Sequence, residues 1–329
     1  MVLTMSEERK ERLQHLRSLA GQPAARSAYA ATLLSPRFGT EVVRAALKAL
    51  ADCPAPAARA DLIRLYESCA THPERDYGAY VRSAVVAALR PIAEPADLAL
   101  FGRAATTFEF PPPSFHEEAA LLRATALLAM DDLDDRLACY HAAGLLMNEH
   151  TDPMSGEPAV SAARILAAAG ELLPLYAYAL QPAAGLLPEV ASECLRQLIR
   201  LPEELVPHLA EHYAASDDPV VLVGLFDLLL NHETGPHGRE RIRDFLTTTE
   251  RTDVYRYLAS SMAAAGHEAL IEDLLTVAGA EQDRARAAVL VETLALLPVT
   301  PRVSELIGRL RQIVAAKLAK SGHAKVERT

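Results

Sequence analysis

The stretch HEEAALLRATALLAM, which covers residues 116–130, decides the fold predicted for this chain. Its leucine and alanine residues recur at spacings of three and four, and this spacing places apolar side chains on one face of an α-helix. A polar His-Glu-Glu start precedes the apolar run. Acidic groups favour the amino end of a helix, where unpaired amide groups need acceptors. The stretch therefore predicts an amphipathic helix with a polar start.

The same design recurs along the chain. Each copy has an acid, Gly or Pro near its start and then apolar residues at helical spacing, with alanine on the face that must approach a neighbour. These copies cover residues 40–50, 78–89, 156–170, 188–199, 218–230, 253–266 and 283–297. Second amphipathic segments lie between them, at residues 56–72, 95–107, 133–147, 171–181, 202–215, 236–248 and 267–278. Such helix pairs bury their apolar faces only by stacking, which predicts an all-α solenoid.

Composition favours the same fold class. Aromatic residues make up 5% of the 329 residues, tryptophan is absent, and half of the chain is apolar. Alanine and leucine favour helices, whereas the β-branched and aromatic residues typical of strands are sparse. The chain is therefore expected to bury a helical core.

The repeated segments resemble the HEAT repeat, in the HEAT-like form of bacterial phycobilin lyases. The residues that carry this resemblance are Val43-Arg44, Val81-Arg82, Leu122-Arg123, Tyr255-Arg256 and Ala285-Arg286. It covers about residues 23–318 and implies a bacterial, right-handed α-solenoid of about eight stacked antiparallel helix pairs. The chain, residues 1–329, is then one domain, with an amino-terminal cap (1–22), a carboxyl-terminal capping helix (301–320) and a flexible basic tail (321–329). Ser161 departs from the pattern, because it stands where the fourth unit would carry arginine.

The resemblance places the Val-Arg helices on the concave face. Their arginines have two interpretations. An arginine one turn into a helix can bond to an acid or a carbonyl of the adjacent repeat and fix the rotation between repeats. Alternatively, Arg44, Arg82 and Arg123 contact a partner, together with Tyr80.

Three long connections, at residues 71–76, 107–114 and 148–156, are expected to project from one edge, because each joins the first helix of a pair to the second. Pro111, Pro112 and Pro113 predict a stiff, extended segment that holds nearby phenylalanines in place. Phe108 and Phe110 are candidate partner anchors, as are Glu149 and His150 in the third loop. The alternative is that Phe110 and Phe115 fold back and fill the gap between repeats, and we expect this for both.

Histidines and carboxylates also gather at this edge. If a metal binds, its ligands would be His116, Glu117, His150 and Asp152, a set that suits iron or zinc. Deoxyhypusine hydroxylase, a HEAT-like enzyme family, is similar in using His-Glu dipeptides across repeats to hold two irons. Here the dipeptide recurs only at His232-Glu233 and His267-Glu268, far along the array. Helix capping explains His116-Glu117 better, so no metal and no cofactor are predicted.

The charge and the motifs bound the function. A net charge of −10 argues against a duplex-binding surface, although residues 302–329 carry seven Lys or Arg and two acids. The four cysteines form no CxxC pair, the amino terminus has no signal-peptide pattern, and no apolar run spans a bilayer. We therefore expect a cytoplasmic monomer that does not bind membranes.

The function predicted is a non-enzymatic scaffold. It would bind a protein or peptide on its concave face and on the loop edge of repeats two to four, and the acidic charge favours a basic partner. Two alternatives stay open: a HEAT-like nucleic-acid-binding protein or DNA glycosylase, and a His-Glu metal-dependent enzyme resembling deoxyhypusine hydroxylase. Catalysis is left open, with the non-enzymatic role favoured.

Overall fold

The computed structural model describes residues 5–113, 115–148, 150–182 and 185–323. Within these residues the chain forms eighteen α-helices, joined by loops and short 3₁₀ turns, and no strand. The predicted all-α class is thus confirmed for the described part. No helix in that part combines the length and the apolar character needed to cross a membrane.

The chain divides into two compact units, residues 1–174 and 175–329, and α10 (Leu172–Ala179) contains the boundary. The helices of the first unit are α1 (Met5–Ser18), α2 (Pro23–Thr32), α3 (Thr40–Asp52), α4 (Arg59–Thr71), α5 (Tyr80–Leu89), α6 (Leu98–Ala105), α7 (Ala120–Asp131), α8 (Asp135–Leu146) and α9 (Ala159–Ala168). Those of the second are α11 (Pro188–Gln197), α12 (Val206–His212), α13 (Pro219–Asn231), α14 (Arg239–Thr248), α15 (Thr252–Ala265), α16 (Glu268–Ala280), α17 (Arg284–Leu294) and α18 (Pro301–His323).

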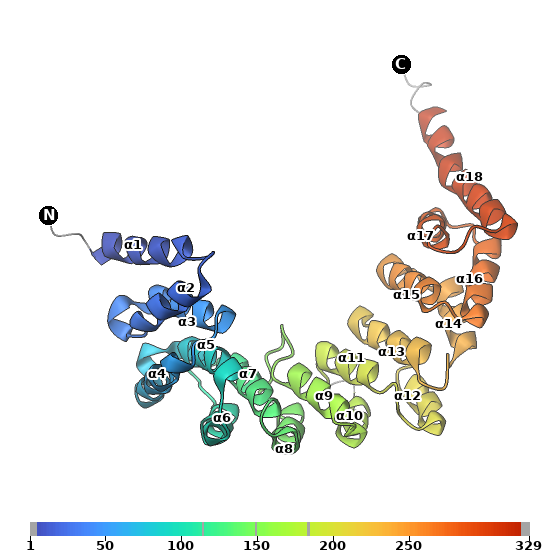
Figure 1. Cartoon of the computed structure of the whole chain (residues 1–329). Coiled ribbons are helices and arrows are strands. Elements are labelled where there is room, and N and C mark those ends of the chain that lie inside the picture. The colour runs from blue at the N-terminus through green and yellow to red at the C-terminus, as the bar shows by residue number, and fades with distance from the viewer. Residues whose placement is uncertain (1–4, 114, 149, 183–184, 324–329) are drawn as a thin grey trace. The chain divides into compact units, whose positions relative to one another are not determined.

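The first unit is built from two rows of helices. Helices α3, α5, α7 and α9 pack in succession and form what we call the stacked row (Figure 1). Helices α2, α4, α6 and α8 each pack against the stacked helix that follows them in the chain. Every helix of the stacked row corresponds to one of the predicted repeated segments, so the arrangement repeats as the sequence pattern indicates.

The second unit repeats this arrangement. Helices α11, α13, α15 and α17 pack in succession, while α14, α16 and α18 lie beside them. One close approach is made by Gly224 of α13, where an added Cβ atom would lie 2.5 Å from the Cα atom and from the carbonyl oxygen of Ser192 in α11. Asp227 then links three helices, because its carboxylate accepts a hydrogen bond from Arg196 of α11 (2.7 Å) and another from the Tyr257 hydroxyl of α15.

Helix starts follow the capping chemistry that the sequence indicates. The side chains of Asp134, Asp218 and Asp283 accept hydrogen bonds from amides in the first turns of α8, α13 and α17. Pro23 and Pro301 begin α2 and α18. Helix α18 continues through residues 321–323, and the rest of the expected tail, 324–329, lies outside the described residues.

The repeat-like packing of eighteen helices is compatible with an α-solenoid. The finer expectations stay predictions: eight antiparallel pairs, a right-handed winding, and one continuous array over residues 1–329.

Candidate functional site

Three loops of the first unit form the candidate site. They join α4 to α5 (residues 72–79), α6 to α7 (106–119) and α8 to α9 (147–158), and we call them together the loop edge. Glu149 lies in the third loop, outside the described residues.

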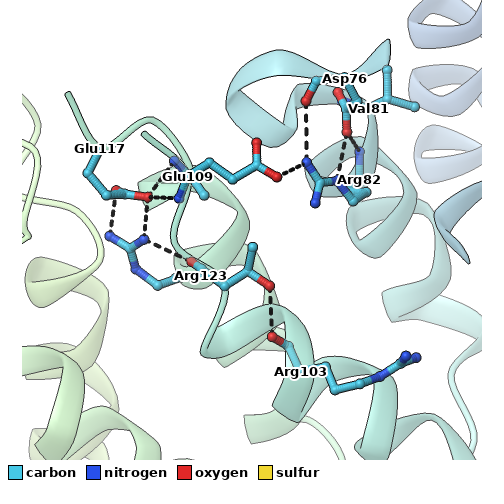
Figure 2. Close-up of polar contacts among 9 residues, drawn as sticks. Asp76, Val81, Arg82, Arg103, Glu109, Glu117 and Arg123 are labelled. Atoms are coloured by element: carbon cyan, nitrogen blue, oxygen red, sulfur yellow. Dashed lines mark hydrogen bonds and ion pairs between the residues drawn. The ribbon is translucent and has the colours of Figure 1, made fainter. Parts of the chain in front are cut away.

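Arg82 holds the first loop to the second. Its guanidinium donates from Nε to Asp76 Oδ2 at 2.9 Å and from Nη2 to Glu109, which belongs to the second loop (Figure 2). Asp76 also caps α5, since its carboxylate accepts from the amides of Val81 (2.7 Å) and Arg82 (3.1 Å). Burial alone would lower the pKa of Arg82, but its hydrogen bonds to Asp76 and Glu109 outweigh that effect and the pKa is raised.

Arg123 holds the second loop to the third. Its guanidinium forms an ion pair with Glu117, with Nη1 2.7 Å from Oε1 and Nη2 2.8 Å from Oε2 (Figure 2). The same group donates to the carbonyl of Thr107 at 3.0 Å and to that of His150 at 2.7 Å. Glu117 in turn accepts from the amides of Ala119 (2.8 Å) and Glu109 (3.2 Å).

The two arginine sites follow one local rule. In each, an acid six residues before the arginine accepts amide hydrogens near the start of the next helix and pairs with the guanidinium. This spacing, Asp76 to Arg82 and Glu117 to Arg123, can be read from the sequence, although it is not part of the Val-Arg pattern that indicated the helices. In the fourth unit Glu157 keeps the capping role by accepting from the amide of Ser161 at 3.2 Å, without an arginine.

The candidate residues thus separate by exposure. Arg82 and Arg123 are 3% and 0% exposed, so their guanidinium groups contact the chain's own acids and carbonyls. Arg44 is exposed on α3, and its guanidinium lies 5.6 Å from the ring centroid of Tyr80, a residue that is 46% exposed. These two residues stand at the surface of the stacked row. Beside them, α3 and α5 border a groove of about 620 Å³ whose lining includes Arg44, Lys48 and Ala84.

The phenylalanines of the second loop differ from the expectation. The Arg123 guanidinium lies over the Phe108 ring, with Cζ 4.3 Å from the ring centroid. The Phe108 ring also contacts the His150 ring, and the two centroids are 5.7 Å apart. Phe110 contacts the same histidine ring at 5.2 Å yet is 44% exposed. Phe115 is 66% exposed, so the prediction that it fills the gap between repeats is wrong. The same prediction for Phe110 holds only in part, because its ring packs against His150 while nearly half of the side chain stays exposed. The backbone explains the exposure of Phe115, which has φ = 52°, a left-handed conformation that large side chains rarely adopt.

Exposed apolar side chains concentrate at this edge. Thirteen large apolar side chains are exposed in the described part of the chain, and eight of them lie in the loop edge or in the first turn of the helix that follows. We call these eight residues the apolar rim: Tyr77, Tyr80, Phe108, Phe110, Phe115, Leu121, Met147 and Met154.

Three of the four residues suggested as metal ligands are Glu117, His150 and Asp152, and each makes other contacts. Glu117 pairs with Arg123, and the His150 ring contacts two phenylalanine rings. Asp152 accepts hydrogen bonds from the amides of Ser155 and Met154, each at 2.8 Å, and the hydrogen bond from the Ser155 amide is the main reason for its lowered pKa. Over the described ranges, no group of three or more His, Cys, Asp or Glu side chains is placed to hold a metal ion.

Comparison of the chain with protein-family models, with curated proteins and with solved structures finds no match. The resemblance to HEAT repeats therefore rests on the residues quoted for it and on the repeat-like packing.

Proposed function

We propose that the chain is a non-enzymatic scaffold that binds a protein or peptide partner along the apolar rim and the adjoining surface of the stacked row. The observation that carries this proposal is the exposure of aromatic side chains on loops whose backbone is fixed by buried ion pairs. An exposed apolar patch of this kind is typical of an interaction surface.

The aromatic content of the rim is a strong support. The whole chain has ten tyrosines and seven phenylalanines, and five of these seventeen residues are exposed in the rim. Aromatic side chains dominate the binding energy of many protein interfaces, because they bury much area and lose little rotamer freedom.

The rigidity of the loops also supports binding. Arg82 connects the first loop to the second, and Arg123 connects the second to the third, so the rim does not depend on three independently moving loops. A surface that is ordered before the partner arrives loses less conformational entropy on binding. The left-handed conformation of Phe115 also indicates a fixed loop. Such a backbone conformation costs about 1–3 kcal/mol of conformational free energy, and it persists only where the surrounding structure imposes it.

The two alternative functions find less support. The loop edge is acidic, whereas nucleic acid requires a basic surface. The ring of His232 in the recurring His-Glu dipeptide bonds to the carbonyl of Leu201 at 2.8 Å and to Thr234, which is the environment of a structural histidine.

Site-specific photo-crosslinking tests the proposal. A benzoylphenylalanine at Phe115 would be introduced into the full chain in the cells that produce it naturally. We expect one or a few proteins to be crosslinked on irradiation, and the yield to fall when Tyr77 and Phe110 are both replaced by serine. The matched control is the same crosslinker at Val299 of the second unit, which is 89% exposed.

The proposal is contradicted if the crosslinker gives the same products at Phe115 and Val299, or if the serine replacements leave the Phe115 products unchanged. Circular dichroism of each variant checks that its helix content is unaltered.

A further inference from the structure

One carboxylate at the loop edge differs from its neighbours. Asp76, Glu109, Glu117 and Asp152 all accept hydrogen bonds or form ion pairs. Glu118 is half-buried, and its carboxylate has neither kind of partner among the described residues. Withdrawing a charge from water is unfavourable unless the charge is paired. An unpaired, half-buried carboxylate in a network where the other acids are bonded therefore points to a cation supplied from outside the chain.

Glu118 is held in place by its backbone. Its amide donates to the carbonyl of Glu109 at 3.0 Å, and α7 begins two residues later. The carboxylate faces Gly78, where an added Cβ atom would lie 3.1 Å from Glu118 Oε2 and 2.6 Å from Tyr80 Cε2. The Glu118 carboxylate and the Tyr80 ring therefore both lie next to Gly78. Leu121, which is 50% exposed, lies in the first turn of α7.

Two aromatic rings of the apolar rim already accept guanidinium groups, and one of them, that of Tyr80, lies beside this carboxylate. Arg44 lies 5.6 Å from the ring centroid of Tyr80, and Arg123 lies 4.3 Å from that of Phe108. Cations are attracted to the face of such rings, and the attraction grows when a carboxylate is close by. Arg44 forms no ion pair with Glu118, so the carboxylate is available to a second cation.

The charge of the loop edge favours the same kind of ligand. By sequence, the first, second and third loops carry net charges of −1, −3 and −3. The positive charges of Arg82 and Arg123 offset two of these seven negative charges. A basic partner is therefore attracted to the rim before any specific contact forms.

We propose that the partner presents an arginine or lysine side chain that pairs with Glu118 and lies against Tyr80 and Leu121. This inference rests on the proposed function, because the basic side chain belongs to the segment that covers the apolar rim. The occupant is a basic peptide segment with apolar residues beside the cation.

Three small probes test it on the full chain: the acetylated, amidated tripeptides Leu-Arg-Leu, Leu-Gln-Leu and Leu-Glu-Leu. Binding is followed by NMR of the leucine methyl groups and tyrosine rings. We expect Leu-Arg-Leu to shift the Leu121 and Tyr80 signals at the lowest concentration. Glu118→Gln should weaken its binding about 5- to 10-fold, which corresponds to about 1–1.4 kcal/mol. Glu118→Lys should reverse the preference in favour of Leu-Glu-Leu. Glu268→Gln, an exposed acid in the first turn of α16, is the charge-matched control and should change nothing.

The outcomes separate the two proposals. If Leu-Gln-Leu binds the rim as well as Leu-Arg-Leu, or if Glu118→Gln has no effect, the inference about the cation falls while the scaffold proposal stands. If none of the three probes shifts Tyr80 or Leu121, the cation site is also overturned, and the crosslinking experiment alone decides the scaffold proposal.

Discussion

Arg123 is a residue on which the loop edge depends, because its fully buried guanidinium holds two loops to α7 at once. Its partners are one carboxylate and two backbone carbonyls, so the positive charge is balanced and four of its bonds are charge-assisted. Phe108 covers the flat face of the same group. One residue thereby fixes the backbone on which the rim phenylalanines stand.

Replacing Arg123 by methionine should destabilise the first unit strongly. The change leaves Glu117, whose side chain is 7% exposed, without its counter-charge, and breaking a buried pair in this way costs about 3–5 kcal/mol. Urea unfolding followed by circular dichroism measures the loss. The matched control is Arg103→Met, which removes a pair with Glu67 whose partners are 60% and 42% exposed and should cost less than about 1 kcal/mol. Equal losses in the two variants would show that the Arg123 pair is not the support described above.

At the scale of helices and their connections, Gly224 sets how closely α13 approaches α11. Alanine at this position should weaken the packing of the second unit by about 1–3 kcal/mol, since backbone atoms of Ser192 occupy the space its methyl group needs. Gly144→Ala in α8 is the control, because nothing lies within 4 Å of a Cβ atom there. It should stabilise the chain by up to about 1 kcal/mol, as alanine favours an exposed helix more than glycine does. Thermal unfolding of both variants checks the opposite signs, and a tolerated Gly224→Ala would mean that the two helices separate easily.

The connection from α13 to α14 should make the second unit sensitive to pH. The buried His232 donates from Nε2 to the Leu201 carbonyl, so its Nδ1 is left to accept, and Nε2 of His237 lies 3.1 Å from that atom. Burial and the neighbouring His232 lower the pKa of His237 below its ordinary value of 6.5, against a smaller opposing effect of Glu203. The folded state then binds fewer protons than the unfolded state, so its stability is complete above about pH 6.5 and falls as the pH drops below that value.

Melting temperatures between pH 5 and pH 8 measure this dependence. We expect the second unit to melt at a lower temperature at pH 5 than at pH 7.5, and His237→Gln to reduce the difference. His267→Gln, an exposed histidine at the N-cap of α16, is the control and should leave the difference as it is. A pH dependence that persists unchanged in His237→Gln would assign it to other groups.

The helices could be predicted from the sequence because periodicity and capping act within a few residues. The segments at 40–50, 78–89 and 218–230 correspond to α3, α5 and α13, and their burial follows the apolar spacing. The position of Phe115 could not be predicted in this way, since it depends on the left-handed backbone of a non-repeating loop. The pairing of Glu117 with Arg123 was within reach, because an acid six residues before an arginine also occurs at Asp76 and Arg82.

At the scale of the whole molecule, the chain consists of two compact units, each with its own stacked helices. Helices in each stack contact mainly their neighbours in sequence order, so stability in such a fold is close to a sum of local contributions. The candidate site lies in the first unit alone. The His232–His237 pair and the α11–α13 approach lie in the second.

Hydrogen exchange followed by mass spectrometry tests this local character in the variants Arg123→Met and Gly224→Ala. Arg123→Met should raise amide exchange in α5 to α9, because α7 packs against α5, α6, α8 and α9, and should leave α13 to α17 as protected as in the parent chain. Gly224→Ala should do the reverse, with the increase centred on α11, α13 and α15. Each variant is the control for the other. If either one raises exchange along the whole chain, the units unfold together, and the loop edge would then depend on packing far from its own arginines.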